Sequence, residues 1–372
     1  MSEFRHISNK KILVLANYDI GLYKFRKALL EELIRSGNEV YISLPYGDLV
    51  PELEKLGCKF VDTVLERRGM NPLKDMHLYR QYRKMLKSVK PDLVITYTIK
   101  PNIYGGFACR LAKIPCAVNI TGLGSAVEGG GLLQKLVFAM YRTGIQKAET
   151  VFFENEGNRD VLLHAGVVKK EKTCVLHGAG IDTDEYACAP YPMEEPLRFL
   201  FVGRIMQEKG VDELFAAVHR LKAEYGDRVV CEMVGMFEES YQVRIEKLVK
   251  DGVIRFHGYQ QNVKLFYANA HCVVLPSWHE GMSNVLLEGA ATGRPLITSD
   301  VHGCMEAVED GISGYLCHVK DAESLYQAMK RFCELSYEER KNMGLAGRKR
   351  MEELFDKKQV VKETIIRINI GK

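Results

Sequence analysis

Short apolar runs alternate with amphipathic segments along almost the whole 372-residue chain. The runs are rich in β-branched residues and apolar on both faces, whereas segments such as 21–37 have apolar residues at every third or fourth position. Runs of this kind, separated by helices, are typical of parallel sheets covered on both faces. The predicted strands are 12–16, 40–44, 59–64, 92–98, 116–121, 150–154, 173–177, 198–203, 229–235, 254–258, 271–276 and 295–300.

The strand series is interrupted by the segment ACAPYPMEEPL at 187–197, which contains three prolines and has no periodicity. Such a segment is typical of a linker. We therefore expect an α/β fold with two doubly wound parallel-sheet domains, at 1–188 and 189–355, which suits domains of roughly 150 residues. Ser336 and Glu339 have the spacing of a capping box, which predicts the start of a helical tail.

Charge is nearly balanced, with 52 basic and 48 acidic side chains, which argues against a dedicated nucleic-acid-binding protein. The first 190 residues nevertheless carry 27 basic and 21 acidic side chains. Much of this excess lies at 67–90, where a helix from about Asn71 would carry most of the basic residues. Two interpretations are equally supported. The helix docks on an anionic membrane, at about 1 kcal/mol per basic residue, or it is solvated and simply covers the sheet. The basic residues are Arg67, Arg68, Lys74, Arg80, Arg83, Lys84, Lys87 and Lys90.

The ten cysteines are scattered and include no C-x-x-C pair, which favours reduced, buried thiols over a disulfide framework or a metal site. The N-terminus lacks the apolar core of a signal peptide, and no apolar run approaches the roughly 18 residues of a membrane span. These features predict a cytoplasmic protein, or one bound peripherally to the inner face of the cell membrane.

The first strand-to-helix turn, at 17–22, contains a single glycine, Gly21. A dinucleotide fold would have G-x-G-x-x-G here, and the phosphate loop of Walker type is absent as well. A lone glycine at a helix start can let one backbone N–H approach an anion, although a plain turn is its more common role.

The first strand of the second domain ends in GRIMQEKG at 203–210, so Arg204 and Lys209 leave the carboxyl edge of the sheet just before a helix. Ligands of open α/β sheets bind at that edge. A planar guanidinium and a compact ammonium suit two neighbouring phosphates. The alternative interpretation is two solvated loop cations.

A second loop of this domain, in PSWHEGMSNVLLEGAATGRPLI at 276–297, carries Glu280 and Gly281 and leads into a helix that starts near Ser283 or Asn284. Free N–H groups at 283–286 would suit an anion. The side chains of Ser283 and Asn284 are expected to be helix caps.

Glu280 and Glu288 are eight positions apart, which separates their Cα atoms by about 12 Å on a helix. The carboxyl groups of a glycosidase lie roughly 5 to 9.5 Å apart. The wider spacing suits two hydroxyl-bearing groups at opposite ends of a long ligand, such as a sugar nucleotide.

Arg204 and Lys209 in GRIMQEKG, followed by Glu280 and Glu288 in EGMSNVLLE, resemble the donor-site signature of the family-4 retaining glycosyltransferases of GT-B fold. With the ITGLG segment at 120–124, the chain is similar to bacterial enzymes that build polyprenyl-diphosphate-linked oligosaccharides and capsules, some of them N-acetylgalactosaminyltransferases. The resemblance implies an acceptor-binding first domain and a nucleotide-sugar-binding second domain, which face each other across a cleft. It also implies that the tail at 356–372 packs back on the first domain.

The resemblance implies a role for each matched residue. Arg204, Lys209 and Glu280 would form the catalytic set, with both cations on the donor diphosphate and Glu280 on the transferred sugar. Glu288 would bind the ribose hydroxyls. The other expected donor contacts are Gly21, Gly203, Gly258, Tyr259, Gly281, Met282, Ser283, Asn284, Val285 and Leu286.

The first domain departs from the family pattern. Many relatives carry a histidine after the fifth strand, where this chain reads Asn119-Ile120-Thr121-Gly122. Asn119 or Thr121 would then contact the sugar, beside Gly122. His177 stands where relatives have asparagine, and is either a structural histidine or another contact of sugar or acceptor.

The sequence therefore predicts a retaining, metal-independent glycosyltransferase without a cofactor. It would move HexNAc or hexose from a UDP-sugar to a lipid-linked, polyprenyl-diphosphate glycan acceptor. Two alternatives remain open: a UDP-sugar 2-epimerase of the same fold and a non-catalytic sugar-nucleotide-binding subunit.

Overall fold

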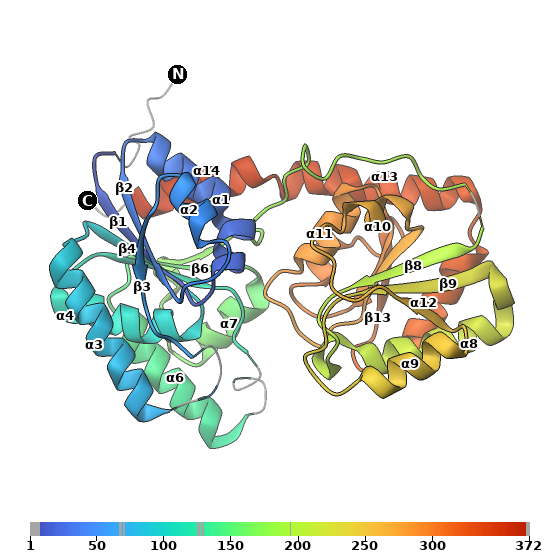
Figure 1. Cartoon of the computed structure of the whole chain (residues 1–372), viewed down its shortest axis with the longest axis horizontal. Coiled ribbons are helices and arrows are strands. Elements are labelled where there is room, and N and C mark those ends of the chain that lie inside the picture. The colour runs from blue at the N-terminus through green and yellow to red at the C-terminus, as the bar shows by residue number, and fades with distance from the viewer. Residues whose placement is uncertain are drawn as a thin grey trace. The chain divides into compact units, whose positions relative to one another are not determined.

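The computed structural model describes residues 8–66, 69, 71–124, 127, 130–193 and 195–369 (Figure 1). The chain forms two compact units, of which the second is Ile181–Asp356 and the first takes the residues before and after it. Each unit is a parallel sheet with helices on both faces. The prediction of two doubly wound sheets is confirmed.

The first unit contains a seven-stranded sheet in the order β3-β2-β1-β4-β5-β6-β7. Its strands are β1 (Lys11–Leu15), β2 (Glu39–Leu44), β3 (Lys59–Asp62), β4 (Leu93–Tyr97), β5 (Cys116–Ile120), β6 (Thr150–Phe153) and β7 (Thr173–Val175). Its helices are α1 (Asp19–Arg35), α2 (Val50–Lys55), α3 (Pro72–Val89), the π-helical turn η1 (Pro101–Gly105), α4 (Gly106–Ala112), α6 (Gly131–Ile145), α7 (Glu156–His164), η2 (Lys170–Lys172) and α14 (Lys357–Asn369).

Alternate residues of each strand pack into two cores, one on each face of this sheet. Leu13 of β1 packs on the side of α3 and α6, whereas its neighbour Val14 packs on the side of α1 and α14. The C-terminal helix α14 thus completes the first unit. It contacts α1, and the carbonyl of Arg367 accepts a hydrogen bond from Thr150 on β6 at 3.4 Å.

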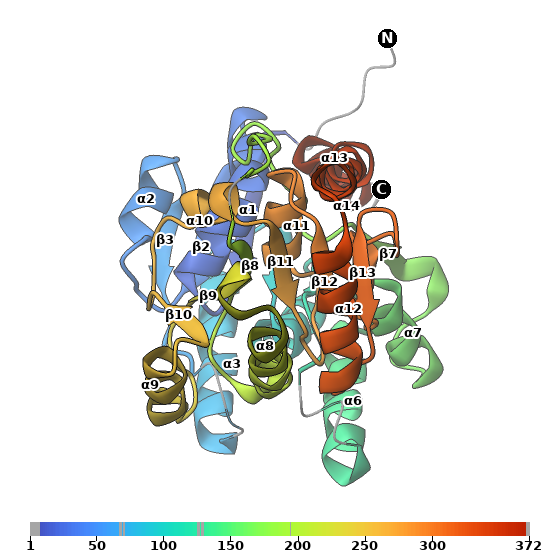
Figure 2. The same cartoon turned by 90° about the vertical axis from the view of Figure 1, so that its right-hand side faces the viewer.

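The second unit contains a six-stranded sheet in the order β10-β9-β8-β11-β12-β13. Its strands are β8 (Leu197–Val202), β9 (Val229–Val234), β10 (Ile254–Phe256), β11 (Cys272–Leu275), β12 (Leu296–Ser299) and β13 (Gly314–Cys317). Its helices are η3 (Gln207–Lys209), α8 (Val211–Tyr225), η4 (Gly226–Arg228), α9 (Gln242–Lys250), α10 (Lys264–Asn269), α11 (Asn284–Ala291), η5 (Met305–Ala307), α12 (Ala322–Glu334) and α13 (Tyr337–Leu354). Figure 2 shows α8, α9 and α12 on one face and α10, α11 and α13 on the other.

Each predicted strand is present, with ends shifted by a few residues. The strand that the sequence pattern missed is β13, whose four residues begin with a glycine. A Cβ on Gly314 would lie 2.0 Å from the carbonyl oxygen of Leu296, so the close pairing with β12 requires glycine there. The predicted capping box of Ser336 and Glu339 opens α13.

The predicted linker at 187–197 is not a connection between the units, because the chain passes from one to the other at Gly180–Ile181. The fully buried guanidinium of Arg294 holds the segment inside the second unit. It donates hydrogen bonds to the carbonyls of Ala189 and Pro190, and Nε donates to the carbonyl of Tyr267 at 2.9 Å. Proline content indicated irregular backbone correctly, but irregular backbone can still be packed.

The cysteines are unpaired, and all except Cys188 and Cys333 are buried. Among the described residues, none of the helices has the length and apolar character needed to cross a bilayer. Within the same residues, no three His, Cys, Asp or Glu side chains gather as a metal site would require.

Candidate functional site

The strongest candidate site lies at the carboxyl ends of β8 and β11, the two central neighbours of the second sheet. From β8 the chain continues to β9 on one side, and from β11 it continues to β12 on the other. The loops that follow the two strands therefore diverge, which is where open α/β sheets bind ligands. These loops carry Arg204, Lys209 and Glu280, as the sequence predicted.

Backbone contacts hold the two loops together. The N–H of Trp278 donates to the carbonyl of Glu208 at 2.9 Å. Gly210 has a left-handed φ of +70°, and a Cβ there would lie 2.0 Å from the carbonyl oxygen of Pro276. Only glycine allows both this backbone conformation and this approach. The position of Lys209, between Glu208 and Gly210, is therefore set by the loop after β11.

Lys209 and Glu280 contact each other directly. The ammonium of Lys209 lies 2.5 Å from Oε1 of Glu280, and the hydroxyl of Ser277 donates to the same oxygen at 2.9 Å. The Lys209 and Glu280 side chains are only 16% and 14% exposed, so water screens the pair weakly. An anion bound by Lys209 would have this carboxylate as its neighbour.

Arg204 follows Gly203 directly at the end of β8 and is more exposed than Lys209. Its Nη1 lies 3.7 Å from Oε2 of Glu238. The structure thus brings the two predicted cations onto one loop and gives each a different carboxylate. Arg204 retains the freedom to turn towards a ligand, because an exposed pair at this distance is worth little.

The start of α11 offers fewer free amides than predicted. The N–H of Ser283 donates to the carbonyl of Gly303 at 2.8 Å, and the N–H of Leu286 donates to the carbonyl of Ser283 at 3.1 Å. Ser283 is the N-cap, as expected. The prediction of free amides was therefore wrong for Ser283 and Leu286. Asn284 and Val285 are the first two residues of the helix, where backbone N–H groups have no carbonyl of the same helix to donate to.

The loop before α11 is fixed by its neighbours. Gly303 has a φ of +87°, and a Cβ there would lie 2.6 Å from the carbonyl oxygen of Glu280 and 2.7 Å from that of Gly281. The side chain of Met282 is buried in the core of the unit. Met282 could therefore reach a ligand only with its backbone.

Glu288 is held by tyrosines that sequence reasoning did not find. The buried hydroxyl of Tyr267, on α10, donates to Oε2 of Glu288 at 2.9 Å. The pKa of Tyr267 is raised well above its usual value by burial and then by the charge of Glu288. Burial and the same carboxylate also raise the pKa of Tyr186. Both phenols therefore stay protonated beside Glu288.

Glycines end three adjacent strands of this sheet. Gly203 follows β8, Gly235 follows β9 and Gly258 lies beyond β10. The N–H of Gly235 donates to the carbonyl of Gly258, and a Cβ on Gly235 would lie 1.7 Å from the carbonyl oxygen of Gly203. Gly235 was not predicted, although it repeats the pattern of a glycine after a strand. Tyr259, beside these glycines, is exposed.

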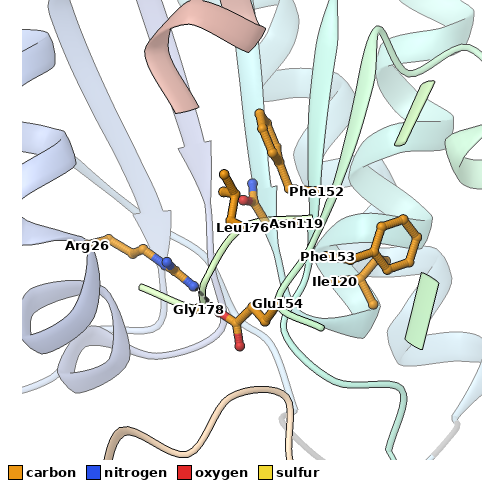
Figure 3. Close-up of a pocket in the computed structure, with 8 residues that line it drawn as sticks. All are labelled: Arg26, Asn119, Ile120, Phe152, Phe153, Glu154, Leu176 and Gly178. Carbon is orange, nitrogen blue, oxygen red and sulfur yellow. Dashed lines mark hydrogen bonds and ion pairs between the residues drawn. The ribbon is translucent and has the colours of Figure 1, made fainter. Parts of the chain in front are cut away.

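In the first unit, Asn119 belongs to a buried network. Its side-chain amide donates to the backbone carbonyl of Thr96 at 3.2 Å, and its backbone carbonyl accepts from the side-chain amide of Asn102 at 2.8 Å. Asn119 also lines a small pocket (Figure 3). The lining residues are Arg26, Asn119, Ile120, Phe152, Phe153, Glu154, Leu176 and Gly178.

The other predicted contacts of the first unit follow its strands without lining this pocket. Thr121 and Gly122 come after β5, and His177 comes after β7. Gly21 lies in the first turn of α1, where a Cβ would meet the ring of Tyr18 at 3.1 Å.

Helix α3 agrees with the sequence pattern. Asn71 is its N-cap, and the apolar residues Leu78, Tyr82 and Leu86 pack into the core of the first unit. Two of the basic residues predicted for this region, Arg67 and Arg68, lie outside the described residues. The other six are exposed: Lys74, Arg80, Arg83, Lys84, Lys87 and Lys90.

Two protein families match this chain. Residues 22–179 match the family described as "Glycosyl transferase 4-like domain", and residues 189–350 match "Glycosyl transferases group 1". Each match falls within one of the two predicted domains.

Similar sequences include "N,N'-diacetylbacillosaminyl-diphospho-undecaprenol alpha-1,3-N-acetylgalactosaminyltransferase" of Campylobacter jejuni. It is 25% identical over 343 residues, which are 87% of this chain and 89% of that protein. Another is "UDP-Gal:alpha-D-GlcNAc-diphosphoundecaprenol alpha-1,3-galactosyltransferase" of Escherichia coli, 27% identical over 73% of each chain.

Solved structures show the same fold. HepE of Anabaena in complex with UDP and glucose has a TM-score of 0.79 at 17% identity, over 95% of this chain and 98% of that chain. A glycosyltransferase of Rickettsia africae has a TM-score of 0.79 at 18% identity, over 98% of this chain and all of that chain. With the two family matches, these similarities confirm the predicted resemblance: the chain belongs to the glycosyltransferases of GT-B fold, with a 4-like first domain and a group 1 second domain.

Proposed function

We propose that the protein is a retaining glycosyltransferase that moves HexNAc or hexose from a UDP-sugar to a polyprenyl-diphosphate-linked glycan. The observation that carries the proposal is the contact of Lys209 with Glu280 where the central loops of the second sheet diverge. The names of the two relatives support the substrates, since both include a diphospho-undecaprenol acceptor and one includes UDP-Gal.

The chemistry of the site suits this reaction. Breaking the bond between sugar and phosphate leaves negative charge on the diphosphate and positive character on the sugar ring. Lys209, Arg204 and the amides that open α11 would oppose the negative charge, and groups held in place beforehand do so at the least cost. Glu280 would accept a hydrogen bond from the sugar, and Glu288 would accept hydrogen bonds from the ribose.

The stereochemical outcome and the absence of a metal are part of the proposal. Oε1 of Glu280 already accepts hydrogen bonds from Lys209 and Ser277, which makes this oxygen a poor nucleophile. Attack from the same face, with the leaving phosphate taking the proton of the acceptor, then accounts for retention. Two protein cations would stabilise the diphosphate without a divalent ion.

The proposal includes a docking surface for an anionic membrane on the first unit. Its electrostatic part is the six exposed basic residues of α3 and its C-cap. Its apolar part is exposed side chains in the first turns of two helices, of which Leu73 on α3 and Leu132 on α6 are 84% and 85% exposed. Figures 1 and 2 both show the N-terminal ends of these helices at the same end of the unit. Basic and apolar side chains together are typical of an interfacial surface.

The experiment is a two-stage assay with the full chain. A thermal-shift screen of nucleotide sugars identifies the donor, because a ligand that binds the native state raises its apparent stability. UDP release is then measured with that donor, with and without GlcNAc-diphospho-undecaprenol and related lipid-linked acceptors. A transferase releases UDP and extends the acceptor. Conversion of the donor without UDP release would indicate an epimerase, and UDP binding without transfer would indicate a binding subunit.

A further inference from the structure

A charged pair lies at the carboxyl edge of the first sheet, in the pocket of Figure 3. Arg26 projects from α1 and Glu154 follows the end of β6, and the guanidinium donates a hydrogen bond to the carboxylate. The two side chains are only 13% and 14% exposed. The family signature does not include either residue.

Arg26 and Glu154 form an ion pair. Burial is the largest influence on the pKa of Arg26 and lowers it, but the charge and hydrogen bond of Glu154, together with Tyr97, outweigh burial, so the pKa is raised. The guanidinium also lies over the ring of Tyr97, at 4.9 Å from its centre. Charges removed from water are costly unless they are well paired, and apolar residues of similar volume often replace such a pair without loss of stability. A charged pair that lines a pocket therefore points to a use other than packing.

The pocket selects for a small group that both donates and accepts hydrogen bonds. It has room for a group about the size of a water molecule, between apolar walls that include Phe152 and Leu176. Arg26 offers N–H donors, and Glu154 offers an acceptor. Because the two charges cancel, a neutral hydroxyl is favoured, whereas Glu154 would repel a phosphate.

We infer that this pocket binds one hydroxyl group of a sugar ring, with Glu154 accepting its hydrogen bond and Arg26 donating to its oxygen. The inference rests on the proposed function and assigns it a specificity site in the first unit. Residues at the carboxyl ends of β5, β6 and β7 line the pocket, which is where ligands of such sheets bind. Asn119, whose side-chain amide donates to the carbonyl of Thr96, also lines the pocket. The sugar is either that of the acceptor or the one being transferred, and the experiment separates them.

The test pairs a conservative variant with substrates that lack single hydroxyls. Glu154→Gln keeps the shape and an oxygen for Arg26 but removes the charge. With the complete donor and acceptor found in the transfer assay, we expect kcat/KM to fall about 10- to 100-fold, the range for a hydrogen bond to a charged group. With the one analogue that lacks the bound hydroxyl, wild type and variant should have equal kcat/KM.

Two series of analogues identify the source of the hydroxyl. If wild type and Glu154→Gln have equal kcat/KM with a deoxy acceptor, the pocket binds the acceptor sugar. If they have equal kcat/KM with a deoxy UDP-sugar, it binds the transferred sugar. Arg26→Lys is measured as a second variant, and its kcat/KM should equal that of wild type with the same analogue. Glu156→Gln is the matched control: Glu156 lies two residues away on α7, is exposed and pairs with Arg159, and the variant should behave as wild type with every substrate.

The inference would be overturned if the kcat/KM of each variant, relative to that of wild type, were the same for every analogue in both series. The pair of Arg26 and Glu154 would then have only a structural role. That outcome leaves the proposed function intact, because wild type remains active. If wild type transfers no sugar from any donor, the proposed function fails and this inference fails with it.

Discussion

At the scale of the residue, the site is a balance of charges rather than a set of free cations. Lys209 is neutralised by Glu280, and Ser277 shares the same carboxylate oxygen. The motif spacing identified Lys209 and Glu280, because each stands at a fixed offset from a strand end. It could not show that the two touch, since the loops come from strands about 70 residues apart in sequence and adjacent only in the sheet.

Lys209→Ala should lower kcat by about 100-fold or more, the scale for one preorganised electrostatic group. The change would also leave Glu280 without its cation beside the proposed donor diphosphate, which adds repulsion. Steady-state UDP release measures the effect. Lys330→Ala, which removes a half-buried lysine paired with Glu224, is the control. Near-normal turnover of Lys209→Ala would remove the proposed role.

Tyr267→Phe should raise the Kd for UDP about 10-fold, because Glu288 loses the hydrogen bond that orients its carboxylate. Calorimetric titration with UDP measures this, and kcat at saturating donor should change less than KM. Tyr141→Phe is a matched control, since it removes another buried tyrosine hydroxyl, on α6 of the first unit. Unchanged UDP affinity in Tyr267→Phe would contradict the positioning role. Tyr267 escaped sequence analysis because it lies 21 residues before Glu288, on another helix.

At the scale of the element, the periodicity of apolar residues predicted which helices and strands pack against a core. It did not predict features set by exposure or by backbone contacts. The apolar residues of α3 recur at helical spacing because one face covers the sheet, as Leu78 and Leu86 show. The same pattern does not report which apolar residues stay exposed, so Leu73 gave no separate signal although it is exposed. β13 was missed for a related reason: Gly314 is dictated by a backbone contact with β12, which leaves no apolar signature.

The membrane surface is tested by sedimentation with vesicles. Wild type should bind vesicles that contain anionic lipid, and binding should weaken as salt is raised. A variant with Arg80→Glu and Lys84→Glu should lose most of this binding, and Leu132→Ser should weaken it at all salt concentrations.

Lys247→Glu and Lys250→Glu, which place the same charge reversals on α9 of the second unit, are the control. Binding that does not depend on anionic lipid at low salt would contradict docking through α3.

At the scale of the whole molecule, both sheets follow one plan: the first strand is third in the sheet, the next two strands lie on one side of it, and the fourth pairs with its other side. The alternation of strands and helices was sufficient to predict this plan. The boundary was misplaced because Ala189 and Pro190 are fixed by Arg294, about 100 residues later in the chain. The composition of the segment 187–197 cannot show that its carbonyls bind an arginine so far along the chain.

Arg294→Met should destabilise the second unit by about 3 kcal/mol or more, because several buried carbonyls lose their donor. Arg294→Lys should recover only part of this, since an ammonium cannot reproduce the planar set of donors. Differential scanning calorimetry of the full chain measures the shift. Arg331→Met, at an arginine on the ring of Tyr315, is the control. A melting profile unchanged by Arg294→Met would contradict the role of the buried guanidinium.

The chain enters and leaves the second unit at nearly the same place. Ile181 and Asp356 are bridged as neighbouring backbone segments, and the N–H of Ile181 donates to the carbonyl of Phe355 at 2.7 Å. At the level of the gene, the second unit is therefore one continuous insertion within the first unit. Exchanging the segment between the two paired ends would therefore give a chimaera that keeps α14 on the first unit and carries the loops after β8 and β11 of another glycosyltransferase.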